Sequence, residues 1–492
     1  MALARLSTRV PRGIGTVVIS ATITLAPLST AVGVSADPLS TSAPAADRAA
    51  CASTGGTVRH LVVFDEGTRE SDATERIDAA CGDTVTYYPE IAVGVATSQD
   101  SSFTERLGDA RSFSAQQRRN AAGSSAESRH APRAGPSTLA PTDPGIVPSA
   151  DRSDEQWGMR MLEVPRARSV SAGDPDVVVG VLDSGIDAAH PELAGAVRAD
   201  LSVGCLSGKP DPSAGSWSPS TSGHGTHVAG TIAAAEDGTG ITGVAPEASV
   251  ASIKVIDDRG YADPEAVVCG LMWAAANSLD VTNSSYVVDP GSLSCVSGTE
   301  LDVAREAIAR AADHATAEGT LNIAATTNDG VNLSPTSADG RGDGCHALPA
   351  SLRSMLTVSA VDSDERKATY SSYGLGVVSV AAPGGEAPRC VLSAAPGGYT
   401  STCGTSMAAP YVSGVAALVA SANPDHGPER IADTLTSSTR NVPCPADYDI
   451  SGDGKQEGYC SGYSGYNGFY GHGIVDAYAA VAGDVEGAPS LE

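Results

Sequence analysis

The sequence predicts an α/β protein with a mostly parallel central sheet and helices on both of its faces. One observation is the apolar, β-branched run Val177–Leu182, whose continuous hydrophobicity is typical of a strand buried on both sides. A second is that such runs alternate with segments of helical pattern from residue 151 onward. This alternation favours a parallel sheet, because parallel neighbours are joined by helical crossovers.

Each element follows from the same two patterns. Further strands are expected over Ser249–Ile256, Leu321–Ala325, Met355–Val361 and Val377–Ala382. Helices are expected over His224–Ala235, Glu265–Asn277, Leu301–Glu318, Ser406–Ser421 and Pro428–Thr436. Ligands of such sheets bind beyond the carboxyl ends of the strands. Polar residues that directly follow a strand are therefore the first candidates for a site.

The N-terminus has the pattern of a targeting signal. Arginines at positions 5, 9 and 12 precede an apolar stretch, and Val34-Ser35-Ala36 offers a small-residue cleavage site. Residues 1–36 are therefore predicted to be a signal peptide, and the protein is expected to be secreted and extracellular. We expect no later segment to span a membrane, because none reads as a continuous apolar run of sufficient length.

The chain after the signal divides into three parts. Residues 37–111 are predicted to contain a small α/β unit, folded over about 51–111, and residues 112–150 a flexible linker rich in Ser, Ala, Arg and Pro. The larger domain is expected over residues 151–485. Within the small unit, the predicted elements are a strand at His60–Phe64, a helix at Glu70–Ala80 and a second strand region at Val85–Ala96.

The net charge excludes some classes of binding partner, and the cysteine content predicts disulfide bonds. The formal charge of −27 argues against nucleic acid or an anionic membrane as a partner. Ten cysteines without a Cys-x-x-Cys pattern indicate disulfides in an exported protein. Short loops favour the local pairs Cys390–Cys403 and Cys444–Cys460, although the cysteines allow many other connectivities.

Three glycine-containing motifs carry the residue types of a serine nucleophile and its base. Asp183 follows a predicted strand, His224 opens a predicted helix, and Ser406 opens another. Serine needs a neighbouring base to attack a carbonyl, and histidine held by a carboxylate is the usual one. A helix N-terminus also favours developing negative charge. Together the motifs predict an acyl-transfer enzyme, although each motif alone is typical of an ordinary turn or helix cap. His227 is interpreted as a hydrogen-bonded structural residue rather than a zinc ligand.

These motifs resemble the signatures of the subtilisin family of serine peptidases. The matching segments are Asp183-Ser184-Gly185-Ile186, His224-Gly225-Thr226-His227-Val228-Ala229-Gly230 and Gly404-Thr405-Ser406-Met407-Ala408, and the resemblance covers about Asp151 to Ala482. It implies a subtilisin-like three-layer fold and an Asp183–His224–Ser406 triad that hydrolyses protein or peptide substrates. It also implies an N-terminal propeptide that inhibits the enzyme within the same molecule, with a maturation cut inside residues 112–150. We expect a monomer.

The resemblance further implies an oxyanion site and a substrate-binding edge. Asn328 follows a predicted strand and is the candidate oxyanion donor, although Thr327 stands where the family has glycine. Gly260, Tyr261 and Ser285 are candidate substrate-binding residues. Where the family usually has Ser-Leu-Gly-Gly, the matching stretch here is Asn283-Ser284-Ser285-Tyr286-Val287, so cleavage preference does not carry over.

The chemistry requires no cofactor, and the metal sites are unknown. Asp449, Ser451 and Asp453 place oxygens at alternate positions, as calcium loops do, but Cys460 stands where an EF-hand has glutamate. A structural calcium ion and a plain acidic turn are both compatible with this loop. Two other functions stay open: a dedicated processing peptidase for one partner protein, and a non-catalytic secreted binding protein on the same scaffold.

Overall fold

The structure is a computed structural model that describes residues 51, 55–124, 150–288, 301–335, 345–450 and 454–483. The signal peptide predicted over residues 1–36 lies outside the described residues, as does most of the linker predicted over residues 112–150. Both therefore stay predictions.

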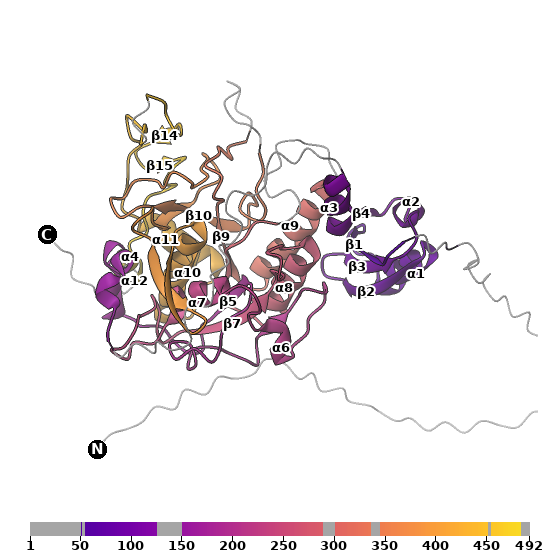
Figure 1. Ribbon diagram of the computed structural model, residues 1–492, viewed down its shortest axis with the longest axis horizontal. Coiled ribbons are helices and arrows are strands. Elements are labelled where there is room, and N and C mark those ends of the chain that lie inside the picture. The colour runs from indigo at the N-terminus through magenta and orange to yellow at the C-terminus, as the bar shows by residue number, and fades with distance from the viewer. Residues whose placement is uncertain are drawn as a thin grey trace, which may run out of the picture. The chain divides into compact units, whose positions relative to one another are not determined.

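The larger domain is built on a seven-stranded sheet in the order β11-β10-β9-β8-β5-β7-β6 (Figure 1). Every neighbouring pair is parallel, which confirms the predicted α/β architecture. The strands are β5 (Val178–Asp183), β6 (Val203–Gly204), β7 (Ser249–Lys254), β8 (Val281–Ser284), β9 (Leu321–Ala325), β10 (Met355–Val361) and β11 (Val380–Pro383).

Two details of the sheet differ from the sequence prediction. The strand predicted from Val377 begins only at Val380, because the amides of Val377 and Val378 turn back onto the carbonyl of Gly374. Strand β8 was not predicted, because its last three residues, 282–284, are polar although fully buried. They are satisfied internally; for example, the Thr282 hydroxyl donates to Asn322 Oδ1 over 2.6 Å.

Helices cover both faces of this sheet (Figure 1). One apolar core contains residues of α7 (His224–Ala233) and α10 (Thr405–Ala422), and the other contains residues of α8 (Pro264–Ala276) and α9 (Leu301–Ala317). Smaller elements complete the domain: η2 (Ser153–Glu155), α4 (Trp157–Met161), α5 (Val164–Arg168), α6 (Ala214–Trp217), β12 (Val391–Ala395), β13 (Gly398–Thr402), α11 (Pro428–Ser437), β14 (Gly462–Tyr463), β15 (Tyr466–Asn467) and α12 (Ala477–Ala482).

Helix α10 is apolar on all sides because it runs through the core. By length and composition it is the one described helix that could cross a membrane, which the sequence prediction did not anticipate. Most of it, 83% of the 18-residue window, is buried inside the protein. A helix that is hydrophobic all round is expected at such a position.

The small N-terminal unit is a four-stranded antiparallel sheet in the order β2-β3-β1-β4 with short helices. Its elements are β1 (Val58–Val63), α1 (Glu70–Ala79), β2 (Gly82–Tyr88), β3 (Val93–Ser98), α2 (Phe103–Arg106), β4 (Arg111–Phe113) and α3 (Ala115–Ser124). The single strand region predicted over Val85–Ala96 is wrong. It is a hairpin that turns between Tyr88 and Val93, where Ala92 has φ of 51°.

The predicted end of this unit at Arg111 is also wrong. Strand β4 extends the sheet beside β1, and α3 then continues to Ser124. The sequence of α3 is polar, so its pattern resembled a linker. Successive side chains along β1 point to opposite faces of the sheet. On one face, Val62 and Phe64 pack on residues of α1 and α2. On the other face, Leu61 and Val63 share the core that contains residues of α8 and α9.

Four disulfides join described cysteines. Cys390–Cys403 and Cys444–Cys460 confirm the two predicted local pairs. Cys205–Cys269 links the segment after β6 to α8, and Cys51–Cys81 closes the N-terminal unit. Cys51 and Cys81 lie beside Asp100 in a cluster with ligand-type side chains, but their sulfurs are bonded to each other.

Candidate active site

The Asp183 and His224 side chains meet at the carboxyl end of the sheet. Asp183 is the last residue of β5 and is fully buried, and His224 is the first residue of α7. His224 Nδ1 lies 2.9 Å from each carboxylate oxygen of Asp183. Because Nδ1 faces the carboxylate, Nε2 is the ring nitrogen that remains for proton transfer.

Glycine allows these two elements to approach so closely. A Cβ on Gly225 would lie 2.5 Å from the carbonyl oxygen of Gly185 and 3.1 Å from Asp183 Cβ. Gly185 has φ of 102°, and a side chain there would meet the backbone between Trp217 and Pro219. Any larger residue at position 225 would therefore push α7 away from β5 and separate the imidazole from the carboxylate.

The electrostatics of the pair favour a protonated imidazole. Burial opposes the charge on His224, but the negative charge of Asp183 and its hydrogen bond outweigh that effect and raise the pKa of His224. His227 behaves in the opposite way. Burial, followed by the nearby His224, lowers the pKa of His227 to about 3, and its Nε2 bonds the Val391 carbonyl over 3.2 Å. This agrees with the structural role predicted for His227.

Ser406 is the second residue of α10, and Ser285 contacts it twice. The Ser406 hydroxyl donates to the Ser285 carbonyl over 3.1 Å, rather than to His224, and the Ser285 hydroxyl donates to the Ser406 carbonyl over 3.0 Å. Pro410 explains the second contact. It lacks an N–H, so the carbonyl four residues earlier, that of Ser406, has no helical donor.

Asn283 holds Ser285 in this position. Its Nδ2 donates to Ser285 Oγ over 2.8 Å, and its Oδ1 accepts the Ser413 hydroxyl of α10 over 3.0 Å. The sequence prediction missed this residue. The sequence indicates Asn283 only as a polar side chain that follows the β-branched residues Val281 and Thr282. That position becomes informative once the structure shows that the strand is buried.

Asn328 is oriented by the residue just before the candidate nucleophile. Its Oδ1 accepts both the amide and the hydroxyl of Thr405, each over 2.9 Å. Its Nδ2 lies 3.4 Å from where a Cβ on Gly404 would stand. With its oxygen anchored, Asn328 keeps its amide N–H groups for another acceptor. Thr327, which stands where the family has glycine, is buried, and its hydroxyl bonds Ser372 Oγ over 2.6 Å. Its side chain therefore points into the protein interior and does not displace Asn328.

Gly260 and Tyr261 lie in a tight turn. Asp257 N bonds the Tyr261 carbonyl over 2.9 Å, and Gly260 has φ of 86°. A single parallel bridge between Ala262 and Val288 joins this segment to the one that contains Ser285. Within the described part of the chain, the Tyr261 ring contacts the guanidinium groups of two arginines, Arg119 and Arg259.

The candidate calcium loop is only partly described. Ser451 and Asp453 lie outside the described residues. The Asp449 carboxylate accepts the Gly454 amide over 2.7 Å, and Glu457 accepts the Ile450 amide over 2.7 Å. These bonds are those of an acidic turn, and calcium binding there stays a prediction.

Comparison with known proteins connects this geometry to a family. Residues 174–473 match the model of the subtilase family, Peptidase_S8. Subtilisin DY of Bacillus licheniformis is 34% identical over 287 residues, which span 58% of this chain and 92% of that protein. Subtilisin E of Bacillus subtilis (strain 168) is 33% identical over 325 residues, 66% of this chain and 70% of that protein.

Solved structures agree with the fold. A protease from Pseudoalteromonas arctica is 30% identical, with a TM-score of 0.51 over 69% of this chain and 99% of that one. The epidermin leader peptide processing serine protease of Staphylococcus aureus is 18% identical and shares the fold alone. Its TM-score is 0.62, over 88% of this chain and 100% of that chain.

Proposed function

This chain belongs to the subtilase family of serine peptidases, and from that membership we propose that it is a secreted endopeptidase with Asp183, His224 and Ser406 as its triad. The observation that carries this assignment is the pair of 2.9 Å contacts between His224 Nδ1 and the Asp183 carboxylate. Such a contact orients the imidazole and stabilises its protonated form.

The proposed reaction passes through an acyl-enzyme. The Ser406 hydroxyl turns from the Ser285 carbonyl toward His224, transfers its proton to Nε2 and attacks the substrate carbonyl. Asn328 Nδ2 and the Ser406 amide at the start of α10 donate to the resulting oxyanion. His224 then protonates the leaving amine. Water, activated by His224 in the same way, releases the acyl group and restores Ser406.

We propose that the enzyme is made as a zymogen in which the N-terminal unit inhibits the catalytic domain. Contacts between the two support this. Arg310 of α9 donates to the carbonyls of Phe64 and Ile91 over 3.0 and 2.9 Å, and Arg111 forms a bidentate ion pair with Glu306. The maturation cut is proposed between the end of α3 and Asp151. The disulfides fit an oxidising, extracellular compartment.

Covalent labelling tests the catalytic assignment. A fluorophosphonate should modify Ser406 of the secreted enzyme, and Ser406→Ala should abolish labelling and lower turnover at least about 10³-fold. Ser421→Ala, at the other end of the same helix, is the matched control and should leave both unchanged. Mass spectrometry of the labelled protein also gives its N-terminus. Label on another residue, or full activity of Ser406→Ala, would refute the triad.

A dedicated processing peptidase is the second candidate function. Two observations favour it. Tyr286 and Val287 replace the open substrate edge of the family, and solved structures with this fold include a lanthipeptide protease and an epidermin leader peptide processing protease. Digestion of a panel of unrelated unfolded proteins separates the two: a general endopeptidase cuts most of them, whereas a processing enzyme leaves most intact.

The monomeric state and a structural calcium ion are proposed on the family resemblance alone, and a chelator-induced drop in melting temperature would test the ion.

A further inference from the structure

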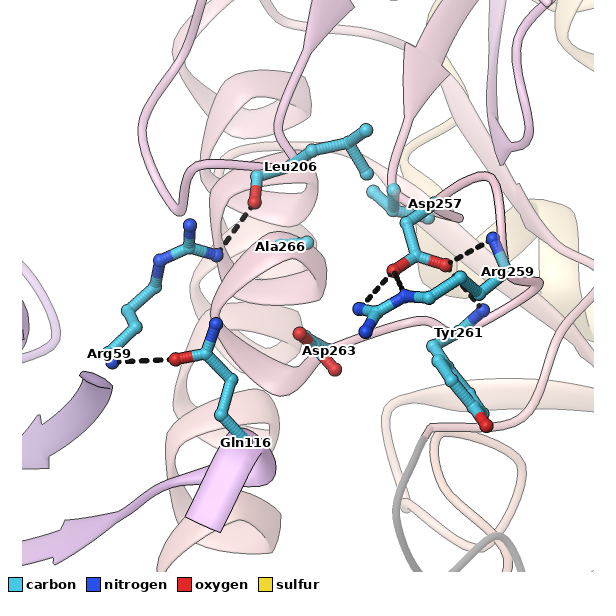
Figure 2. Close-up of a pocket in the computed structure, with 9 residues that line it drawn as sticks. Arg59, Gln116, Leu206, Asp257, Arg259, Tyr261, Asp263 and Ala266 are labelled. Carbon is cyan, nitrogen blue, oxygen red and sulfur yellow. Dashed lines mark hydrogen bonds and ion pairs between the residues drawn. The ribbon is translucent and has the colours of Figure 1, made fainter. Parts of the chain in front are cut away.

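A cavity of about 200 Å³ lies where the N-terminal unit meets the turn at residues 257–263 (Figure 2). Arg59 and Gln116 line one side, and Asp257, Tyr261 and Asp263 line the other. It adjoins Gly260 and Tyr261, the candidate substrate edge, and the start of α8. The cavity therefore lies at the candidate substrate edge, in a region that removal of the N-terminal unit would open.

An arginine of the N-terminal unit already occupies part of this region. The Arg119 guanidinium carbon lies 4.8 Å from the centroid of the Tyr261 ring. Arg119 also pairs with both carboxylate oxygens of Asp263, with Nη2 3.0 Å from Oδ2. The two side chains are only 14% and 13% exposed. An aromatic face combined with a two-oxygen acceptor is the arrangement that recognises a planar guanidinium.

The cations paired with the first two carboxylates at the start of α8 come from the N-terminal unit, whereas Arg259 of the catalytic domain also lies over the Tyr261 ring, 5.2 Å from its centroid. Among the described residues, the ion pairs of Asp263 and Glu265 are with Arg119 and with Arg59, the latter over 3.4 Å. The nearby Asp257 instead pairs within its own turn, with Arg259. Once the N-terminal unit has been removed, Asp263 and Glu265 are left without these partners.

We propose that Tyr261 and Asp263 form a subsite of the mature enzyme for an arginine side chain of the substrate, which Arg119 fills in the precursor. The inference rests on the proposed function, because it requires a mature peptidase that has released α3. The subsite favours arginine over lysine, since only the guanidinium stacks on the ring while donating two parallel hydrogen bonds to one carboxylate.

The test uses full-length chain that has been expressed and allowed to mature, with active enzyme counted by fluorophosphonate labelling. Peptide substrates carry one arginine at successive positions before the cut, and each has a partner with citrulline, which is neutral but of similar shape. At one position arginine should raise kcat/KM about tenfold over citrulline, as expected for hydrogen bonds to a charged group. Lysine should fall between the two.

Two variants locate the effect. Asp263→Asn should reduce the arginine preference from about tenfold to about twofold, the share left to the Tyr261 ring, and asparagine is as good a helix N-cap as aspartate. Tyr261→Leu should lower the arginine preference independently. If the Asp263→Asn protein does not mature, this second variant still tests the subsite. Asp258→Asn is the control, because Asp258 is a neighbouring exposed carboxylate that pairs with Lys254 over 3.8 Å.

Each outcome decides something. Labelled, active enzyme without an arginine preference at any position would overturn the subsite and leave the proposed function intact. Equal loss of preference in Asp258→Asn and Asp263→Asn would also overturn it, because a diffuse negative field would then explain the result. If the N-terminus of the mature enzyme lay before Arg119, this arginine would remain part of the enzyme chain. That result would also overturn the subsite. Failure of any serine to label would overturn the proposed function, and the subsite with it.

Discussion

The imidazole of His224 sits between two opposing influences. Burial penalises its charge, whereas the Asp183 carboxylate 2.9 Å away stabilises that charge and prevails, so the pKa of His224 is raised. His224 must be neutral to accept the Ser406 proton. The proposed activity is therefore present above the raised pKa and is lost as the pH falls through it.

Asp183→Asn tests this balance. Removing the carboxylate charge should lower the pKa of His224, so the acidic limb of the kcat/KM profile moves to lower pH. Turnover should fall by about 10⁴-fold, the size of the loss when a triad aspartate is replaced by asparagine. The measurement is a pH–rate profile of the variant beside the wild type. An acidic limb that moves to higher pH would contradict the assignment of His224 as the base.

Asn328 provides a second prediction at the residue scale. Asn328→Ala should lower kcat by about 10²–10³ with little change in KM, the loss seen when such a donor is removed from a subtilisin. Asn332→Ala is a suitable control, because the Asn332 side chain accepts the Ser334 amide of its own turn over 2.9 Å. Comparable losses in the two variants would indicate a local structural effect rather than oxyanion binding.

At the scale of elements, the segment before the nucleophile is fixed from two sides. The β12–β13 hairpin leads into α10, and Cys390–Cys403 ties the segment before β12 to the residue that precedes Gly404. Gly385 packs on the same bridge, since a Cβ there would lie 3.2 Å from Cys403 Sγ. The disulfide thus limits the movement of the turn that presents Ser406.

Replacing both Cys390 and Cys403 by serine should cost about 3 kcal/mol of unfolding free energy, because the bridge closes a loop of 13 residues. It should also lower kcat. The Cys444–Cys460 bridge closes a similar loop of 16 residues that does not include the turn before Ser406, so its removal should cost about as much stability but spare kcat. Urea unfolding in the Ser406→Ala background avoids self-digestion. An equal effect of both pairs on kcat would contradict a positioning role.

At the scale of the whole molecule, the contact between the N-terminal unit and the catalytic domain combines an apolar centre with charged edges. Leu61 and Val63 of β1 share a core with α8 and α9, while Arg310 donates to two carbonyls of the N-terminal unit. Hydrogen bonds from charged donors stabilise a contact more than neutral ones do. Removing the charged donor should therefore weaken the contact between the N-terminal unit and the catalytic domain. Release of the inhibitor should therefore depend on α9.

Arg310→Met should shorten the lag before activity appears by about tenfold, because the two carbonyl contacts are lost while the aliphatic stem is kept. Arg305→Met, an exposed position on the same helix, should leave the lag unchanged. The readout is a time course of activity against the fraction of processed chain. Equal lags in Arg310→Met and Arg305→Met would show that this contact does not restrain release.

Much of the architecture could be predicted because its signals are local. Strands β9 and β10 coincide with their predicted bounds, since each is a short apolar run between turn residues. Strand β8 and helix α3 could not be predicted in this way. The polar side chains of β8 are satisfied by residues of β9, of α10 and of the segment that follows β8. Helix α3 is polar along a length that alone would resemble a linker.

The sequence by itself determined the fold class, the two local disulfides and the residue types of the proposed triad, because periodicity, spacing and short motifs are properties of the chain. Only the tertiary structure decided that Ser285 and Asn283 support Ser406, and that Arg119 lies on Tyr261 and Asp263. Ser285 and Ser406 are 121 residues apart in the sequence, and Arg119 and Asp263 are 144 residues apart. Their contacts depend on how strands and helices pack, and a linear pattern does not encode that arrangement.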